Sequence, residues 1–100
     1  MAVDIRWLEE ANDDIQSIIS YISSDNPKAA HAYVEAVARS CIKLSEFPES
    51  GHVFNEKYRV LAIRNHVVFY RYDAGANTVS IARVLDGRRD IATLLGGEEV

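Results

Sequence analysis

The sequence predicts an α+β fold in which a hairpin of two helices packs on one face of a twisted, mainly antiparallel sheet. Apolar residues recur every three or four positions between Leu8 and Leu44, as on the buried side of amphipathic helices. Segments rich in β-branched and aromatic residues follow between Tyr58 and Asp86. A break containing Ser, Asp and Pro at residues 23–27 divides the helical half into two. The expected order of elements is β-α-α-β-β-β, in two layers.

The N-terminal part predicts a short strand followed by a helix. Residues 3–7 alternate apolar and charged side chains, which is typical of a strand. The helical period then begins, with its apolar side at Leu8, Ala11, Ile15, Ile18, Ile19 and Ile22. Glu9 and Glu10 oppose the positive end of the helix dipole. No Ser, Thr, Asp or Asn cap precedes this helix, so its first residue stays open.

The second helix has clearer limits. Asn26 is a good N-cap, and Pro27 suits the first helical position because its missing N–H is not needed there. Its apolar side is expected at Ala30, Val34, Val37, Cys41 and Leu44. Pro48 ends the helix. Because the link between the two helices is short, they should form an antiparallel pair.

Three strands are predicted in the C-terminal half. Residues 52–57 are expected to form a loop, residues 58–63 a strand, and residues 88–95 one or two helical turns. The strongest local prediction is a hairpin of residues 66–73 and 78–86, joined by a tight loop in which Gly75 and Asn77 supply positive φ angles.

Strict alternation along the last strand predicts an unusual place for Arg83. Alternation puts this residue on the same face as the apolar residues Val79, Ile81 and Leu85. A guanidinium among apolar neighbours must be paired, reach outward to solvent or line a functional surface. Asp86 is expected on the opposite face.

Length and composition bound the class of protein. The 100 residues predict a single domain spanning 1–100, and 48% hydrophobic with 26% charged residues is an ordinary globular composition. No apolar run approaches the length of about 20 residues that spans a bilayer, and no signal sequence is evident. The single Cys41 cannot form an internal disulfide, which suits a cytoplasmic location.

No recognisable catalytic or metal motif is present in the sequence. His31, His52 and His66 lack metal-ligand spacing, so neither a metal nor a cofactor is expected. Asp13 and Asp14 are adjacent on the first helix, so their side chains should diverge toward solvent. His66 is either a general base or a group that only makes a hydrogen bond at a strand start.

Charge is unevenly distributed along the chain. Residues 1–56 hold ten acidic and four basic side chains, whereas residues 57–97 hold seven basic and three acidic ones. This split predicts an acidic helical half and a basic sheet half. The basic half either faces phosphate or an acidic protein partner, or its Arg residues only solvate the sheet and pair with the helices. The net charge of −4 argues against general nucleic-acid binding.

Six motifs follow one another along the sequence. They are Ala11-x-x-Asp14-Ile15-x-x-Ile18-x-x-Tyr21-Ile22, Asn26-Pro27-x-Ala29-Ala30, Leu44-x-x-Phe47-Pro48-x-x-Gly51, Arg59-Val60-Leu61, His66-Val67-Val68-Phe69-Tyr70-Arg71 and Arg83-Val84-Leu85-x-Gly87-Arg88-Arg89-Asp90. In order and spacing, they resemble the ParE branch of the RelE/ParE toxin superfamily over nearly the whole chain. The resemblance implies a type II toxin that inhibits DNA gyrase and is neutralised by a cognate antitoxin. The RelE branch instead cuts mRNA on the ribosome.

The chain departs from the family pattern at several positions. Asp86 stands where the ParE branch usually has His. Val67 stands where the RelE branch often has Arg, and the tyrosine expected after the C-terminal Arg pair is missing. Two alternatives therefore stay open, an mRNA interferase of the RelE type and a degenerate, non-toxic module that only binds antitoxin.

The resemblance and the charge pattern together predict a target-binding surface and not a catalytic site. Its residues are Arg59, His66, Tyr70, Arg83, Asp86, Arg88 and Arg89. The expected partners are an antitoxin and DNA gyrase, with no catalytic residue, cofactor, membrane or direct nucleic-acid contact.

Overall fold

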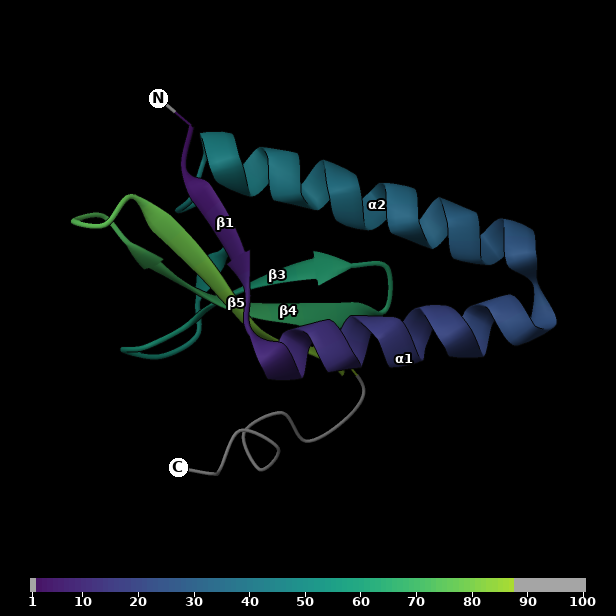
Figure 1. Ribbon diagram of the computed structural model, residues 1–100. Helices are drawn as coiled ribbons and strands as arrows, with labels where there is room; N and C mark the ends of the chain where they lie inside the picture. Colours follow the sequence, from purple (N-terminus) through teal and green to yellow (C-terminus); the bar gives the residue numbers. More distant parts are fainter. Residues whose placement is uncertain (1, 88–100) are drawn as a thin grey trace.

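The computed structural model describes residues 2–87 (Figure 1). Its elements are β1 (Asp4–Trp7), α1 (Glu9–Asp25), α2 (Pro27–Glu46), β2 (His52–Val53), β3 (Arg59–Ile63), β4 (His66–Asp73) and β5 (Thr78–Asp86). The helical turns predicted at residues 88–95 lie outside the described residues, as do Arg88 and Arg89.

The strands form a five-stranded sheet in the order β1-β5-β4-β3-β2. β1 runs parallel to β5, and the other neighbouring pairs are antiparallel. The two helices run antiparallel to each other and cover one face of the sheet (Figure 1). The predicted α+β class, with a helical hairpin on a mainly antiparallel sheet, is confirmed.

The starts of both helices follow from local chemistry. The side-chain oxygen of Asn26 accepts a hydrogen bond from the Ala29 N–H at 3.1 Å, and Pro27 begins α2, as predicted. α1 has no side-chain cap at Leu8. Instead, the Leu8 N–H donates to the Ile81 carbonyl of β5 at 3.0 Å. The sheet therefore determines where α1 begins.

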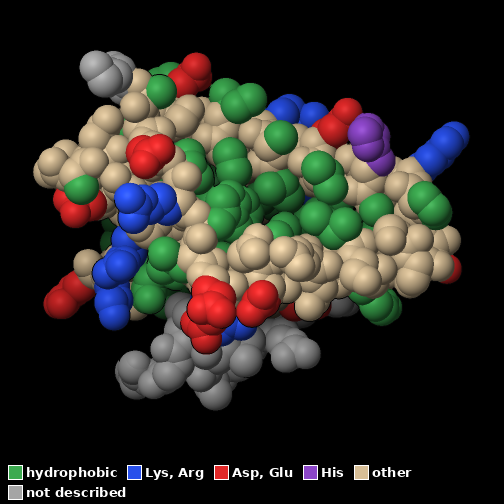
Figure 2. Space-filling model, in the orientation of Figure 1, with side chains coloured by type: hydrophobic (Ala, Val, Ile, Leu, Met, Phe, Trp, Pro, Cys, Tyr) green, Lys and Arg blue, Asp and Glu red, His purple; other side chains and the backbone are tan. Residues whose placement is uncertain are grey.

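The core lies between the helices and the sheet. It contains Ile15 of α1, Leu44 of α2, Val68 and Tyr70 of β4 and Ile81 of β5, all buried. Figure 2 shows further apolar side chains gathered along the seam between α1 and α2. Within residues 2–87, no helix has the length and apolar character needed to cross a bilayer.

Two details of the sheet differ from the prediction. His52 and Val53 do not belong to a loop, because they pair with Val60 and Arg59 as the edge strand β2. Two residues are too few to show an alternating pattern, so only their pairing with β3 makes them a strand. In the β4–β5 loop, Asn77 has the expected positive φ of 54°, but Gly75 has no φ in that region.

A β-bulge in β5 overturns the predicted alternation. Tyr70 pairs with Ile81 but Phe69 pairs with Arg83, so Ala82 is an extra residue in β5. Directly paired residues share a face of the sheet. Arg83 therefore lies on the face of Phe69, opposite to Ile81, and the expectation that it shares a face with Val79 and Ile81 is wrong.

Tyr33 of α2 provides a test of the core. Its side chain is buried, and its ring packs edge-to-face on the His66 ring with 5.5 Å between the ring centroids. Its hydroxyl has no hydrogen-bond partner within residues 2–87. Burial raises the Tyr33 pKa from 10.0 to about 12. Since the folded state retains this proton, part of its stability should be lost as the pH rises from 10 toward 12.

We expect Tyr33→Phe to stabilise the protein by about 1 kcal/mol, because it removes a buried hydroxyl without a partner. Urea unfolding near neutral pH measures this gain. The variant should also lose less stability between pH 10 and 12 than the wild type does. A destabilised variant would show that the hydroxyl is satisfied in solution.

Candidate functional site

Arg59 and Tyr70 meet at the loop between α2 and β2. The Arg59 guanidinium donates through Nη1 to the carbonyl oxygens of Gly51 at 2.9 Å and Glu49 at 3.2 Å. The Tyr70 hydroxyl accepts a hydrogen bond from the Gly51 N–H at 2.9 Å. Burial raises the Tyr70 pKa, so the hydroxyl stays protonated at neutral pH. These two side chains hold the loop against the sheet.

Arg83 is paired with Asp14 of α1. Its Nε donates to Asp14 Oδ2 at 2.7 Å and its Nη2 donates to Asp14 Oδ1 at 3.1 Å. The Val84 N–H donates to the same Oδ2 at 2.9 Å. The hydrogen bond to Asp14 raises the pKa of Arg83. Asp14 therefore does not point to solvent, as its place beside Asp13 suggested, but ties α1 to β5.

His66 and Asp86 lie at the open end of the β4–β5 hairpin, next to the turn between β3 and β4. They are register partners, at the first residue of β4 and the last of β5. The Gly87 N–H donates to the Asn65 carbonyl at 3.0 Å, which holds the chain to this turn just before it leaves the described residues.

The described members of the predicted surface therefore fall in three places. Arg59 and Tyr70 hold the loop at Gly51, Arg83 is paired with α1, and His66 with Asp86 ends the hairpin. As the last residue before Gly87, Asp86 is the described member nearest in sequence to Arg88 and Arg89.

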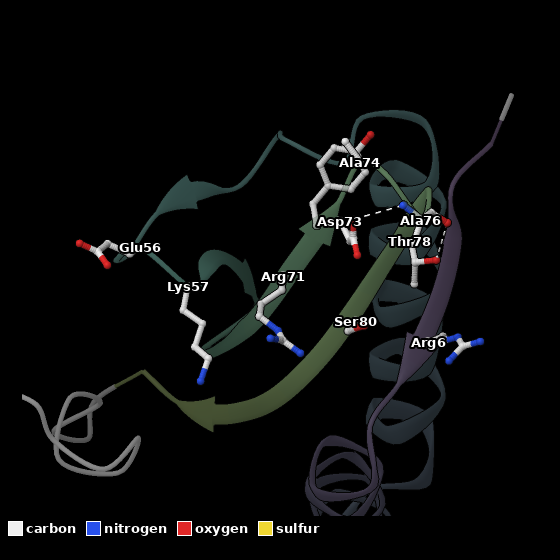
Figure 3. Close-up of a pocket in the computed structure, with 10 residues that line it drawn as sticks. Arg6, Glu56, Lys57, Arg71, Asp73, Ala74, Ala76, Thr78 and Ser80 are labelled. Atoms are coloured by element: carbon white, nitrogen blue, oxygen red, sulfur yellow. Dashed lines mark hydrogen bonds between the residues drawn. The ribbon is translucent and has the colours of Figure 1, made fainter.

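A further basic region on the helix-free face of the sheet was missed in the sequence. A groove of about 620 Å³ lies there, and its basic lining residues are Arg6 of β1, Lys57 before β3 and Arg71 of β4 (Figure 3). The signal was present, since Arg6 stands between the inward-facing Ile5 and Trp7. This alternation did not indicate a shared basic region, because the sequence does not show that β1 lies beside β5 in the sheet.

The sequence matches a family model described as the ParE toxin of the type II toxin–antitoxin system parDE, over residues 5–91. The chain belongs to the ParE toxin family. A search of curated proteins gives no match.

Solved structures share the fold of this ParE-family chain. A chain of the chromosomal ParDE system from P. aeruginosa has a TM-score of 0.70 at 15% identity, covering 85% of this chain and 96% of that one. A chain of the RelBE2 toxin–antitoxin complex from Mycobacterium tuberculosis has a TM-score of 0.61 at 21% identity, covering 86% of this chain and 99% of that one. A mutant of the E. coli toxin RelE in the free state has a TM-score of 0.66 at 14% identity, covering 91% of this chain and 90% of that one.

Within the described residues of this ParE-family chain, no three His, Cys, Asp or Glu side chains are grouped as metal ligands would be. Cys41 is half-buried on α2, and burial raises the pKa of its thiol. A raised pKa keeps the thiol protonated at neutral pH, which is typical of a packing residue and not of a nucleophile.

Proposed function

We propose that this ParE-family chain is a toxin that inhibits DNA gyrase by binding it and is neutralised by a cognate antitoxin. The family match over residues 5–91 carries the proposal, because it covers both helices and, apart from Asp4 of β1, every strand. The paired Arg59 and Arg83 support binding over catalysis. A cation held by a carboxylate or by carbonyl oxygens is less available to stabilise charge in a reaction.

The target-contacting surface that we propose lies at the end of β5. Arg83 keeps a quarter of its side chain exposed while paired with Asp14, so it can still touch a partner. Asp86 follows on the same strand, and Arg88 and Arg89 follow it in sequence. Arg59 and Tyr70 contribute by holding the neighbouring loop, and His66 by its place beside Asp86.

Purified toxin should inhibit DNA supercoiling by gyrase and leave ribosome-bound mRNA intact. Both assays use the same preparation, with the toxin–antitoxin complex as the inactive control. Rapid mRNA cleavage with normal supercoiling would move the protein to the RelE type of activity. Absence of both effects, with antitoxin binding retained, would indicate the degenerate binding module.

Asp86 gives a variant that tests this surface. A carboxylate near guanidinium groups cancels one unit of positive charge, although one exposed pair contributes below about 1 kcal/mol. We expect Asp86→His, which restores the usual family residue, to strengthen gyrase inhibition severalfold. Inhibition curves at matched protein concentration measure this change. Asp73→His, at the last residue of β4 and the opposite end of the hairpin, is the control, and an equal effect there would argue against a site at Asp86.

The antitoxin contact is proposed at the other edge of the sheet. Ile42, Phe47 and Val53, between the end of α2 and β2, are all more than half exposed. β2 pairs with only two residues of β3. Within residues 2–87, the outer side of β3 at residues 61–63 therefore has no neighbouring strand. An open edge flanked by apolar side chains suits an added strand. Co-expression should yield a complex that buries more than about 1,200 Å².

A further inference from the structure

The helix-free face of the sheet carries cations that the fold itself does not use. Arg6 and Arg71 are exposed, and within residues 2–87 neither forms an ion pair or a side-chain hydrogen bond. Arg59 and Arg83 differ, because each is held by internal acceptors. Arg6 and Arg71 are therefore available to a partner.

Register places these cations in one row across three strands. Arg6 of β1 pairs with Ser80 of β5, and Ser80 pairs with Arg71 of β4. Neighbouring strands lie about 4.8 Å apart, so the two Arg backbones are separated by about 10 Å with a hydroxyl between them. Lys57 extends the basic side of the groove beyond Arg71 (Figure 3).

The groove also carries acidic side chains, which indicate the kind of partner. Asp73 and Glu56 line it together with the three cations. Asp73 is held in place, because its Oδ1 accepts a hydrogen bond from the Ala76 N–H at 3.2 Å. A nucleic-acid backbone carries a negative charge at every nucleotide, so some of its phosphates would lie against these two carboxylates and be repelled. A peptide with separated carboxylates can match this mixed pattern.

We propose that this groove binds an acidic, extended segment of a partner protein. Alternate residues of an extended segment lie on one side, about 7 Å apart. Two such carboxylates reach Arg71 and Arg6, whose long side chains span the remaining distance and donate paired hydrogen bonds to carboxylates in bidentate geometry. The Ser80 hydroxyl lies between them as a further donor. The inference does not depend on which enzyme the toxin inhibits.

The test uses the full-length chain and a short, fluorescent, Ser-rich peptide with two Glu residues at alternate positions, and binding is measured by fluorescence anisotropy at low salt. The wild type should bind this peptide but not the matched peptide with Gln for Glu. Arg6→Glu combined with Arg71→Glu should weaken binding at least about tenfold, since two ion pairs become repulsive contacts. The milder Arg71→Gln should weaken it less, and circular dichroism checks the fold of each variant.

Lys28→Glu is the control, because it makes the same cation-to-carboxylate change, at one residue, on the helix side of the molecule. It should leave peptide affinity nearly unchanged. Failure of the wild type to bind the Glu peptide would overturn the proposal, as would equal losses in Lys28→Glu and the Arg variants. Tighter binding of a short single-stranded DNA, lost in the Arg variants, would instead assign the groove to phosphates. None of these results depends on gyrase inhibition.

Discussion

Replacing Gly51 with alanine is expected to destabilise the domain by about 2–4 kcal/mol. A Cβ at this position would lie 2.6 Å from the Tyr70 hydroxyl and 2.6 Å from the Val60 carbonyl oxygen. Both atoms are constrained, the first in the core and the second in the sheet backbone. The methyl group therefore displaces the loop, and the hydrogen bond from the Gly51 N–H to Tyr70 is lost with it. Urea unfolding at neutral pH measures the loss.

Two further variants separate the clash from the hydrogen bond. Tyr70→Phe alone should cost about 1–2 kcal/mol, because it leaves the buried Gly51 N–H without its acceptor. Combined with Gly51→Ala it should cost less than the sum, since the phenol oxygen is one of the two obstructing atoms. Gly75→Ala, whose Cβ would approach Asp73 no closer than 3.4 Å, is the control and should be nearly neutral. A harmless Gly51→Ala would show that the loop shifts freely.

The elements that could be predicted from sequence are those with long, regular patterns. Both helices repeat their apolar residues over several turns, and α2 also has Asn26 and Pro27 at its start. The hairpin of β4 and β5 consists of two strands rich in β-branched and aromatic residues, joined by a turn. Local sequence determines such elements because each residue reinforces the same period.

The bulge at Ala82 and the pairing of β2 could not be predicted in this way. Both depend on which residue lies opposite in a neighbouring strand, and a single extra residue reverses the face of everything beyond it. Arg83 was thus assigned to the wrong face, although the expectation that it must be paired, solvent-exposed or functional includes its actual pairing with Asp14.

The candidate site could be predicted only in part, for a similar reason. Counting charges separated an acidic half from a basic half, but it did not show which cations are already paired with acceptors inside the fold. Arg59 and Arg83 look the same in sequence as Arg71, yet of these three only Arg71 faces outward without an internal acceptor in the described part of the chain. The partner of Arg83 lies 69 positions away, beyond any local pattern.

Removing the Asp14 carboxylate is expected to be among the most damaging single changes outside the core. Asp14→Ala deletes three hydrogen bonds at once, two from Arg83 and one from the Val84 N–H. The Asp14 and Arg83 side chains are only 17% and 25% exposed, so water replaces these bonds incompletely. We expect a loss of about 2–4 kcal/mol in the free energy of unfolding.

Arg83→Ala should cost less, about 1–2 kcal/mol, because Asp14 then keeps its hydrogen bond from Val84. The double variant should be close to Asp14→Ala alone, since the Arg83 contribution acts through the carboxylate. Urea unfolding of the three variants gives the coupling directly, with Asp13→Ala as the exposed neighbouring control. Equal losses in Asp14→Ala and Arg83→Ala would contradict the role given to Val84, because the carboxylate would then contribute nothing beyond the ion pair. If Arg83 also contacts the target, Arg83→Ala should lower gyrase inhibition more than Asp14→Ala does, even though it is the more stable of the two.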